Sequence, residues 1–163
     1  MQIEGDSFRS SILYWLRILE ERANQEFVVA MGGGKAVVAR WRTLSVLAEL
    51  SGITVTELSA HTQIERTALS HLLTQLEKEE LLKRVPRKDD RRILEVHLLP
   101  SGRDLFEKML PVRRRVFRQA ADGLAPDELE LMMATTRHLV ENLERSSDDR
   151  QSRRVREPAD AKG

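Results

Sequence analysis

The sequence has no cysteine and few aromatic residues, and these two shortages exclude several classes of protein. Among its 163 residues there is no cysteine, and aromatic side chains make up 4%. Without cysteine the chain can form no disulfide, no thiolate nucleophile and no cysteine-based redox switch. Because aromatic residues are scarce, the places where they gather are the first candidates for a ligand site.

The sequence also lacks a long apolar run and a large net charge. No stretch is apolar for long enough to span a bilayer, and the first residues include Glu4, Asp6 and Arg9, unlike a signal peptide. We therefore expect a cytoplasmic protein with no membrane partner. The formal net charge is +1, so binding to nucleic acid would have to come from the local placement of cations.

The residue types that carry catalysis or bind metals are scattered along the chain. The histidines at 61, 71, 97 and 138 form no helical pair and have no cysteine beside them, so we expect no metal and no cofactor. The sequence shows no nucleophile beside a base and no pair of carboxylates beyond what chance would give, so we expect no enzyme.

Gly32 to Gly34 precede Lys35, but the Walker pattern needs another glycine spacing and a Ser or Thr after the lysine. We interpret this run as a flexible turn, with direct ligand contact as the alternative.

The hydrophobic periodicity predicts one domain over residues 1–147, followed by a flexible tail over 148–163. Helices are expected over about 8–31, 101–123 and 126–145, and they flank a lobe over about 35–99 that opens with a helix over 35–50. Pro111 should kink the second of the flanking helices or remove a hydrogen bond. The last helix carries a broad apolar stripe that no earlier element needs, which favours a partner subunit. The tail arginines could attract DNA, with a passive tail as the alternative.

The stretch from Thr54 to Leu99 predicts a helix-turn-helix followed by a hairpin. Thr54 to Leu58 open a short helix with its capping residues, Gln63 and Ile64 form a tight turn, and a second helix runs from Glu65 to Leu82. Leucines at 69, 72, 73 and 76 repeat at intervals of three and four and define an apolar face. The opposite face and the turn supply our predicted DNA contacts: Gln63, Arg66, Thr67, Ser70, His71 and Thr74. The acidic end, Glu77 to Glu80, should point away from DNA.

The hairpin carries most of the local positive charge. Strands are predicted over 82–85 and 93–99, with a short edge strand over 53–55. From Lys83 to Arg92 there are six basic residues against two acidic ones. Arginine suits phosphate and the narrow minor groove. Asp90 should accept hydrogen bonds from Arg92 and hold its side chain extended. The predicted contacts of this loop are Arg87, Lys88, Asp90, Arg91 and Arg92, and the alternative is a solvated, charged hairpin tip.

These segments together resemble the multiple-antibiotic-resistance regulator (MarR) family of winged-helix transcription factors. The resemblance covers roughly 8–144 and is densest over 41–103. The family's Asp-x-Arg wing signature falls on Asp90-Arg91-Arg92, and its Leu-Thr-x-x-Gly-Arg helix start appears as Leu99 to Arg103. Pro100 replaces the Thr, and Ser101 can still cap the helix.

The resemblance implies a mainly α fold with a small β-hairpin: a winged helix-turn-helix plus a helical dimerisation stem. It implies a homodimeric repressor of transcription that a phenolic or other lipophilic anion releases from DNA. In a two-fold dimer, two recognition helices enter successive major grooves, so the double-stranded DNA site should be an inverted repeat with half-sites roughly 10 base pairs apart.

Two groups of residues are candidates for contact with a small aromatic or anionic effector. Arg40 and Arg42 flank Trp41, and paired arginines beside an aromatic ring could hold an anionic aromatic molecule. The first helix offers Tyr14, Trp15 and Arg17. The alternative is that Trp41 is plain core and that the arginines are solvated or paired with acidic neighbours.

Other functions stay open at this point. The protein could regulate transcription without a ligand or as an activator, or it could be a winged-helix module that binds another protein. A protein-binding module would lose nothing when Arg92 is replaced by Ala, and its binding would not depend on salt.

Overall fold

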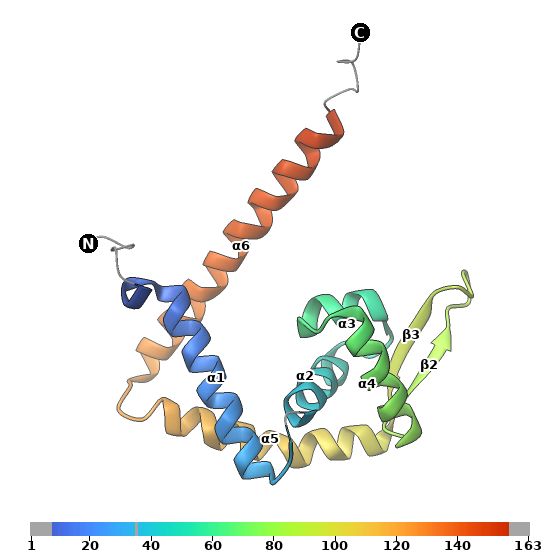
Figure 1. Ribbon diagram of the computed structural model, residues 1–163, viewed down its shortest axis with the longest axis horizontal. Coiled ribbons are helices and arrows are strands. Elements are labelled where there is room, and N and C mark those ends of the chain that lie inside the picture. The colour runs from blue at the N-terminus through green and yellow to red at the C-terminus, as the bar shows by residue number, and fades with distance from the viewer. Residues whose placement is uncertain (1–7, 35, 157–163) are drawn as a thin grey trace. The chain divides into compact units, whose positions relative to one another are not determined.

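The computed structural model describes residues 8–34 and 36–156, with side chains as far as Ser147. The chain forms two compact units, Met1–Ala120 and Ala121–Gly163. The first unit holds all elements from η1 to α5, and the second holds α6 (Figure 1). In order, the elements are η1 Phe8–Ser10, α1 Ile12–Met31, α2 Ala36–Glu49, β1 Ile53–Thr54, α3 Val55–Thr62, α4 Arg66–Lys78, β2 Leu82–Pro86, β3 Leu94–Leu98, α5 Pro100–Ala120 and α6 Pro126–Arg156. The mainly helical class with a small β element is confirmed.

The first helix is shorter than the predicted span of 8–31. Its first residues form the separate 3-10 turn η1, and Ser11, in an extended conformation, precedes α1. At the other end Gly32 adopts a left-handed φ of 65° and donates its N–H to Val28 and Val29. A residue without a Cβ takes this conformation at little cost, so the glycine run ends the helix as predicted. Lys35, the expected start of the next helix, lies outside the described residues.

The helix-turn-helix is built by local capping. Thr54 and Glu57 form a reciprocal capping box at the start of α3, with a Thr54 N to Glu57 Oε2 distance of 2.7 Å. Gln63 ends α3 in a left-handed conformation, with φ of 54°. The predicted second helix from Glu65 to Leu82 was too long, because α4 ends at Lys78. There Glu80 adopts a φ of 58° and the Leu81 N–H donates to the Leu76 carbonyl, which closes the helix before β2.

The sheet has three antiparallel strands in the order β1-β3-β2. Glu95 on the central strand is the register partner of Thr54 on one side and of Val85 on the other. The predicted edge strand over 53–55 is confirmed for its first two residues, and Val55 begins α3 instead. The central strand thus joins the wing hairpin to the start of the helix-turn-helix.

Two buried clusters support this arrangement. The first lies under α3, α4 and the sheet and includes Leu58, Leu69, Leu73 and Val96. The second joins α1, α2 and α5 and consists of Phe27, Leu44, Met109 and Val116. Helices α1 and α2 pack on α5, which passes from one cluster to the other (Figure 1).

Helix α5 begins where the hairpin returns. It starts at Pro100, so Ser101 does not cap it from outside as expected; the Ser101 hydroxyl instead donates to the Glu80 carbonyl. Gly102 is buried, and a Cβ at this position would clash with the Leu81 carbonyl oxygen. The helix continues through Pro111 and ends at Ala120, before Gly123. Among the described helices, none has both the length and the hydropathy needed to cross a membrane.

The last helix extends beyond the predicted 126–145. α6 runs from Pro126 to Arg156 and therefore overlaps the expected tail. Residues 157–163 lie outside the described residues, as do the side chains of Arg150, Arg153, Arg154 and Arg156.

Candidate nucleic-acid interface

Helix α4 presents a buried apolar face and an exposed polar one, as its sequence predicts. Leu69, Leu73 and Leu76 are fully buried, and Leu72 is half-buried. The predicted contact residues on the other face are all exposed: Arg66, Thr67, Ser70, His71 and Thr74. Their side chains are short or can form hydrogen bonds, which is what contact with base edges requires.

The tip of α4 is capped by a carboxylate that sequence analysis missed. Glu65 accepts hydrogen bonds from the backbone N–H groups of Thr67, at 2.8 Å, and Ala68, at 3.1 Å. These bonds lower the pKa of Glu65. The first free N–H groups of the helix are therefore occupied. An incoming phosphate would have to bind through side chains.

Two of the predicted contacts also shape the turn between α3 and α4. Arg66 donates to Thr56 Oγ1 at 2.6 Å and so joins the first turns of the two helices. The side chain of Gln63 donates to the Ala60 carbonyl. Both side chains stay exposed at the tip, but each already has a partner within the motif.

Two arginines from neighbouring elements hold the acidic end of α4. Arg84 on β2 donates to Glu77 from its backbone N–H, its Nε and its Nη2, at 2.9, 3.0 and 2.6 Å, and its Nη2 also donates to Thr74 Oγ1 at 3.2 Å. Arg40 on α2 binds both oxygens of Glu79, at 2.8 and 2.6 Å. These hydrogen bonds lower the pKa of both carboxyls. Two of the glutamates at this end, Glu77 and Glu79, are thus paired with arginines of the protein itself.

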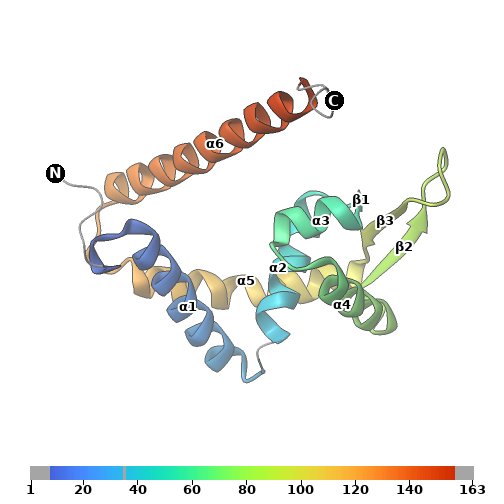
Figure 2. The same ribbon diagram turned by 45° about the horizontal axis from the view of Figure 1, so that its top comes forward.

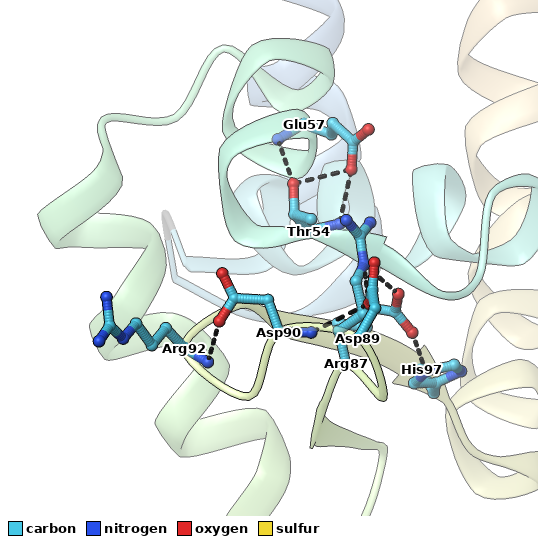
Figure 3. A network of polar contacts seen from close by, with 8 residues as sticks. Thr54, Glu57, Arg87, Asp89, Asp90, Arg92 and His97 are labelled. Atoms are coloured by element: carbon cyan, nitrogen blue, oxygen red, sulfur yellow. Dashed lines mark hydrogen bonds and ion pairs between the residues drawn. The ribbon is translucent and has the colours of Figure 1, made fainter.

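The wing loop follows β2 and carries exposed cations. Lys88, Arg91 and Arg92 are exposed, and Lys88 and Arg91 line a small surface pocket of about 370 Å³ with Pro86 and Arg87. Asp90 does accept from Arg92, but the donor is the Arg92 backbone N–H, at 3.0 Å (Figure 3). The prediction that Asp90 accepts a hydrogen bond from the Arg92 guanidinium is therefore wrong. Asp90 shapes the turn, and the Arg92 side chain extends away from it.

The predicted effector residues do not gather at one place. Trp41 is half-buried and packs against the second core cluster, stacked on Phe106 at 5.4 Å and edge-on to Phe27 at 5.7 Å between ring centroids. Tyr14 and Trp15 contact each other, at 5.2 Å between ring centroids, near the start of α1.

The three arginines of this set point to different partners. Arg40 is held by Glu79 on α4, Arg42 pairs with Glu20 on α1, and Arg17 pairs with Glu21. Of the six predicted residues, Arg17 and Arg42 line the same pocket, an open space of about 570 Å³ between α1 and α2.

Arg113 is a further cation near this pocket that sequence analysis did not select. It donates to Asn24 Oδ1 at 3.1 Å and lies over the Phe27 ring at 5.6 Å. Burial lowers the pKa of Arg113; nearby, Glu20 acts to raise it and Arg42 to lower it further. Arg42 thus pairs with Glu20 beside the pocket, and Arg113 is held by Asn24 within reach of both charges. The triple arginine at 113–115 was its sequence signal, but nothing local shows which of the three is buried.

Comparison with known proteins agrees with this geometry. Residues 38–94 match the model of the MarR family. The transcriptional repressor IacR of Pseudomonas putida is 24% identical over 142 residues, which cover 86% of this chain and 85% of that protein. A MarR-family transcriptional regulator from Silicibacter pomeroyi has the same fold, with a TM-score of 0.73 at 23% identity over 83% of this chain and 92% of that one.

A second solved structure, BpsR of Bordetella bronchiseptica, has a TM-score of 0.73 at 23% identity, and the match covers 84% of this chain and 98% of that one. The DNA binding of BpsR is regulated by 6-hydroxynicotinic acid. The curated relatives are transcriptional regulators, a class that does not catalyse reactions. The chain thus matches the model of the MarR family over residues 38–94 and shares the winged-helix fold of a solved MarR-family regulator.

Proposed function

We propose that this protein is a homodimeric transcriptional repressor that binds double-stranded DNA at an inverted repeat and is released by a small anionic effector. The observation that carries the proposal is that α4, whose polar face is exposed, packs on β2 of the hairpin that carries the cationic wing loop, within one unit (Figure 2). Thr67, Ser70 and His71 would enter the major groove, and Arg92 would reach the flanking minor groove. The proposal places the protein in the cytoplasm, together with its DNA.

The dimer is proposed from apolar surface that one chain leaves uncovered. On α1, Leu13 and Trp15 are exposed, and on α6, Leu131, Met133 and Leu143 are exposed. Apolar surface of this extent is typical of an interface. In the proposed protein, residues 8–147 form one winged-helix domain with its dimerisation helices.

The effector site is proposed at the pocket between α1 and α2. Arg42 there is neutralised by Glu20, and Arg113 lies close enough to both for their charges to act on it. A bound carboxylate or phenolate would compete with Glu20 for Arg42. The aromatic ring of such a ligand would find Val28, Val29 and Val38 on the pocket wall. The ligand would release DNA only if it binds the DNA-competent and incompetent states unequally.

Selection of bound sequences from random duplexes tests the DNA-binding part of this proposal. We expect the full chain to enrich an inverted repeat with half-sites roughly 10 base pairs apart. Arg92→Ala should weaken binding at every selected site, and Arg92→Lys should weaken it less. A different result would favour a winged helix that binds another protein: no duplex is enriched, and Arg92→Ala binds that protein as well as the wild type does. A ligand screen that measures release from the selected duplex tests the effector.

A further inference from the structure

Arg87 differs from the other wing cations because three carboxylates surround it. Its Nε donates to Glu95 Oε1 at 2.9 Å, and Asp89 Oδ1 lies 3.8 Å from the same nitrogen. The hydrogen bond to Glu95 is the main cause that raises the pKa of Arg87, and the charges of Asp89 and Glu57 add to it. The positive charge that Arg87 could offer to a phosphate is therefore offset in part by its neighbours.

The other wing cations have no such neighbours. Lys88, Arg91 and Arg92 are exposed, and within the described part of the chain no ion pair engages their side chains. Cations of this kind can replace counterions on DNA. The wing thus contains one internally paired arginine and three available cations.

The carboxylates around Arg87 include residues of β3 and α3, the two elements against which the wing must be oriented. Glu95 lies on the central strand β3, and its second oxygen is 3.4 Å from His97 Nε2. Glu57 belongs to the capping box that starts α3. Figure 3 shows the Arg87 side chain between that cap and the hairpin. The backbone N–H of Arg87 also donates to the Ile93 carbonyl across the base of the loop, at 2.9 Å.

We propose that Arg87 is a positioning residue, which fixes the direction of the wing against β3 and α3, while Lys88, Arg91 and Arg92 make the wing's contacts with DNA. The inference rests on the proposed DNA binding and deepens it. Loss of Arg87 would free the wing root, and Arg92 would then reach the minor groove less often. Affinity would fall although no phosphate contact is lost.

The salt dependence of binding separates positioning from phosphate contact. Each phosphate contact contributes about 0.9 to the slope of log K against log salt concentration. We expect Arg87→Gln to weaken binding to the selected duplex about tenfold with the wild-type slope. The matched control Lys88→Gln, on the same loop, should lower the slope by about 0.9. A slope for Arg87→Gln that falls as far as that of the control would overturn the proposal.

Two further substitutions distinguish positioning from direct electrostatic contact, because the two roles predict different changes in DNA affinity. Glu95→Gln removes a negative charge near DNA, so a purely electrostatic role for Arg87 predicts equal or tighter binding. The positioning role predicts weaker binding, because a neutral amide oxygen holds the guanidinium of Arg87 less strongly than the charged carboxylate does. Arg87→Lys keeps the charge but lacks Nε, and it should bind as weakly as Arg87→Gln. Wild-type affinity in Arg87→Lys, or tighter binding by Glu95→Gln, would contradict the proposal.

Amide hydrogen exchange of the protein without DNA gives an independent readout. Residues 88–93 should exchange faster in Arg87→Gln and Glu95→Gln than in the wild type, and Lys88→Gln should leave the exchange rates unchanged. If the wild type binds no duplex, the proposed function fails, and the exchange data still decide whether Arg87 holds the wing. Equal exchange in all four proteins would overturn the inference.

Discussion

Within one chain, the winged-helix lobe buries its apolar side chains, whereas the flanking helix α6 leaves many of its own exposed. In the lobe, Leu58, Leu69 and Leu73 are fully buried. On α6, Leu131 is 68% exposed and Leu143 is 65% exposed. The lobe thus completes its core within one chain, whereas α6 carries surface that association would bury. Stability of the lobe and assembly of the molecule should therefore respond to different substitutions.

The largest effect is expected in the lobe core. Leu73→Ala should lower the free energy of unfolding by about 2–5 kcal/mol, because it leaves a cavity among tightly packed leucines. Denaturant unfolding followed by helical circular dichroism measures this change. Leu131→Ala removes the same atoms from a site that is exposed within one chain, so it is the matched control when the protein is diluted enough to be dissociated. Equal losses in the two variants would erase the contrast between lobe and α6.

The next effect tests the junction between the lobe and α5. Gly102→Ala places a Cβ against the Leu81 carbonyl oxygen and the Leu98 side chain. We expect a loss of roughly 1–3 kcal/mol, because backbone atoms cannot move aside cheaply. Gly34→Ala serves as control, since a Cβ there meets nothing within 4 Å. The two variants can be compared by thermal unfolding, and equal melting temperatures would contradict this account of the junction.

A smaller effect is expected on assembly. Leu143→Ser should weaken self-association about tenfold, the factor that corresponds to loss of roughly 1.5 kcal/mol of apolar burial. Arg137→Ser on the same exposed helix is the control. Sedimentation equilibrium of both variants measures the dissociation constant. If Leu143→Ser associates as tightly as the control, this part of α6 is not the interface.

The smallest effect depends on pH and concerns the Arg40–Glu79 pair. The fold lowers the pKa of Glu79 from its ordinary value of 4.5, chiefly through the hydrogen bond from Arg40. A carboxyl with a lowered pKa stabilises the fold above that ordinary value and loses this contribution as the pH falls through the lowered one. Glu79→Gln should therefore be less stable than the wild type at neutral pH, and the gap should shrink below about pH 4.5. A gap that is constant with pH, measured by denaturant unfolding, would mean that the pair does not stabilise the fold.

The sequence predicted elements whose pattern is local. The leucine spacing of α4 follows from burial on one face, so the helix and its buried face are confirmed. The strand β3 is confirmed as well, but only Val96 on it is fully buried, and Leu94 at the wing end is exposed. Their ends were harder to predict. α4 stops at Lys78 because Glu80 turns left-handed, and a glutamate gives no sequence signal for that conformation.

The candidate site was predictable only where it is exposed. Arg40 and Arg42 are two positions apart, so they leave α2 in different directions, and their partners Glu79 and Glu20 are distant in sequence. Glu95 gave no signal as the acceptor of Arg87, because the pairing depends on strand register. Such partners follow from tertiary packing, which no periodicity in one segment specifies.

The most direct test of the central claim, that the exposed face of α4 contacts bases, is the sequence preference of His71→Ala. Selection from random duplexes would be run in parallel on the wild type and this variant. The account predicts that both enrich inverted repeats with the same spacing and that the preferred bases change within each half-site. Identical base preferences would contradict it and would place the contacting surface elsewhere.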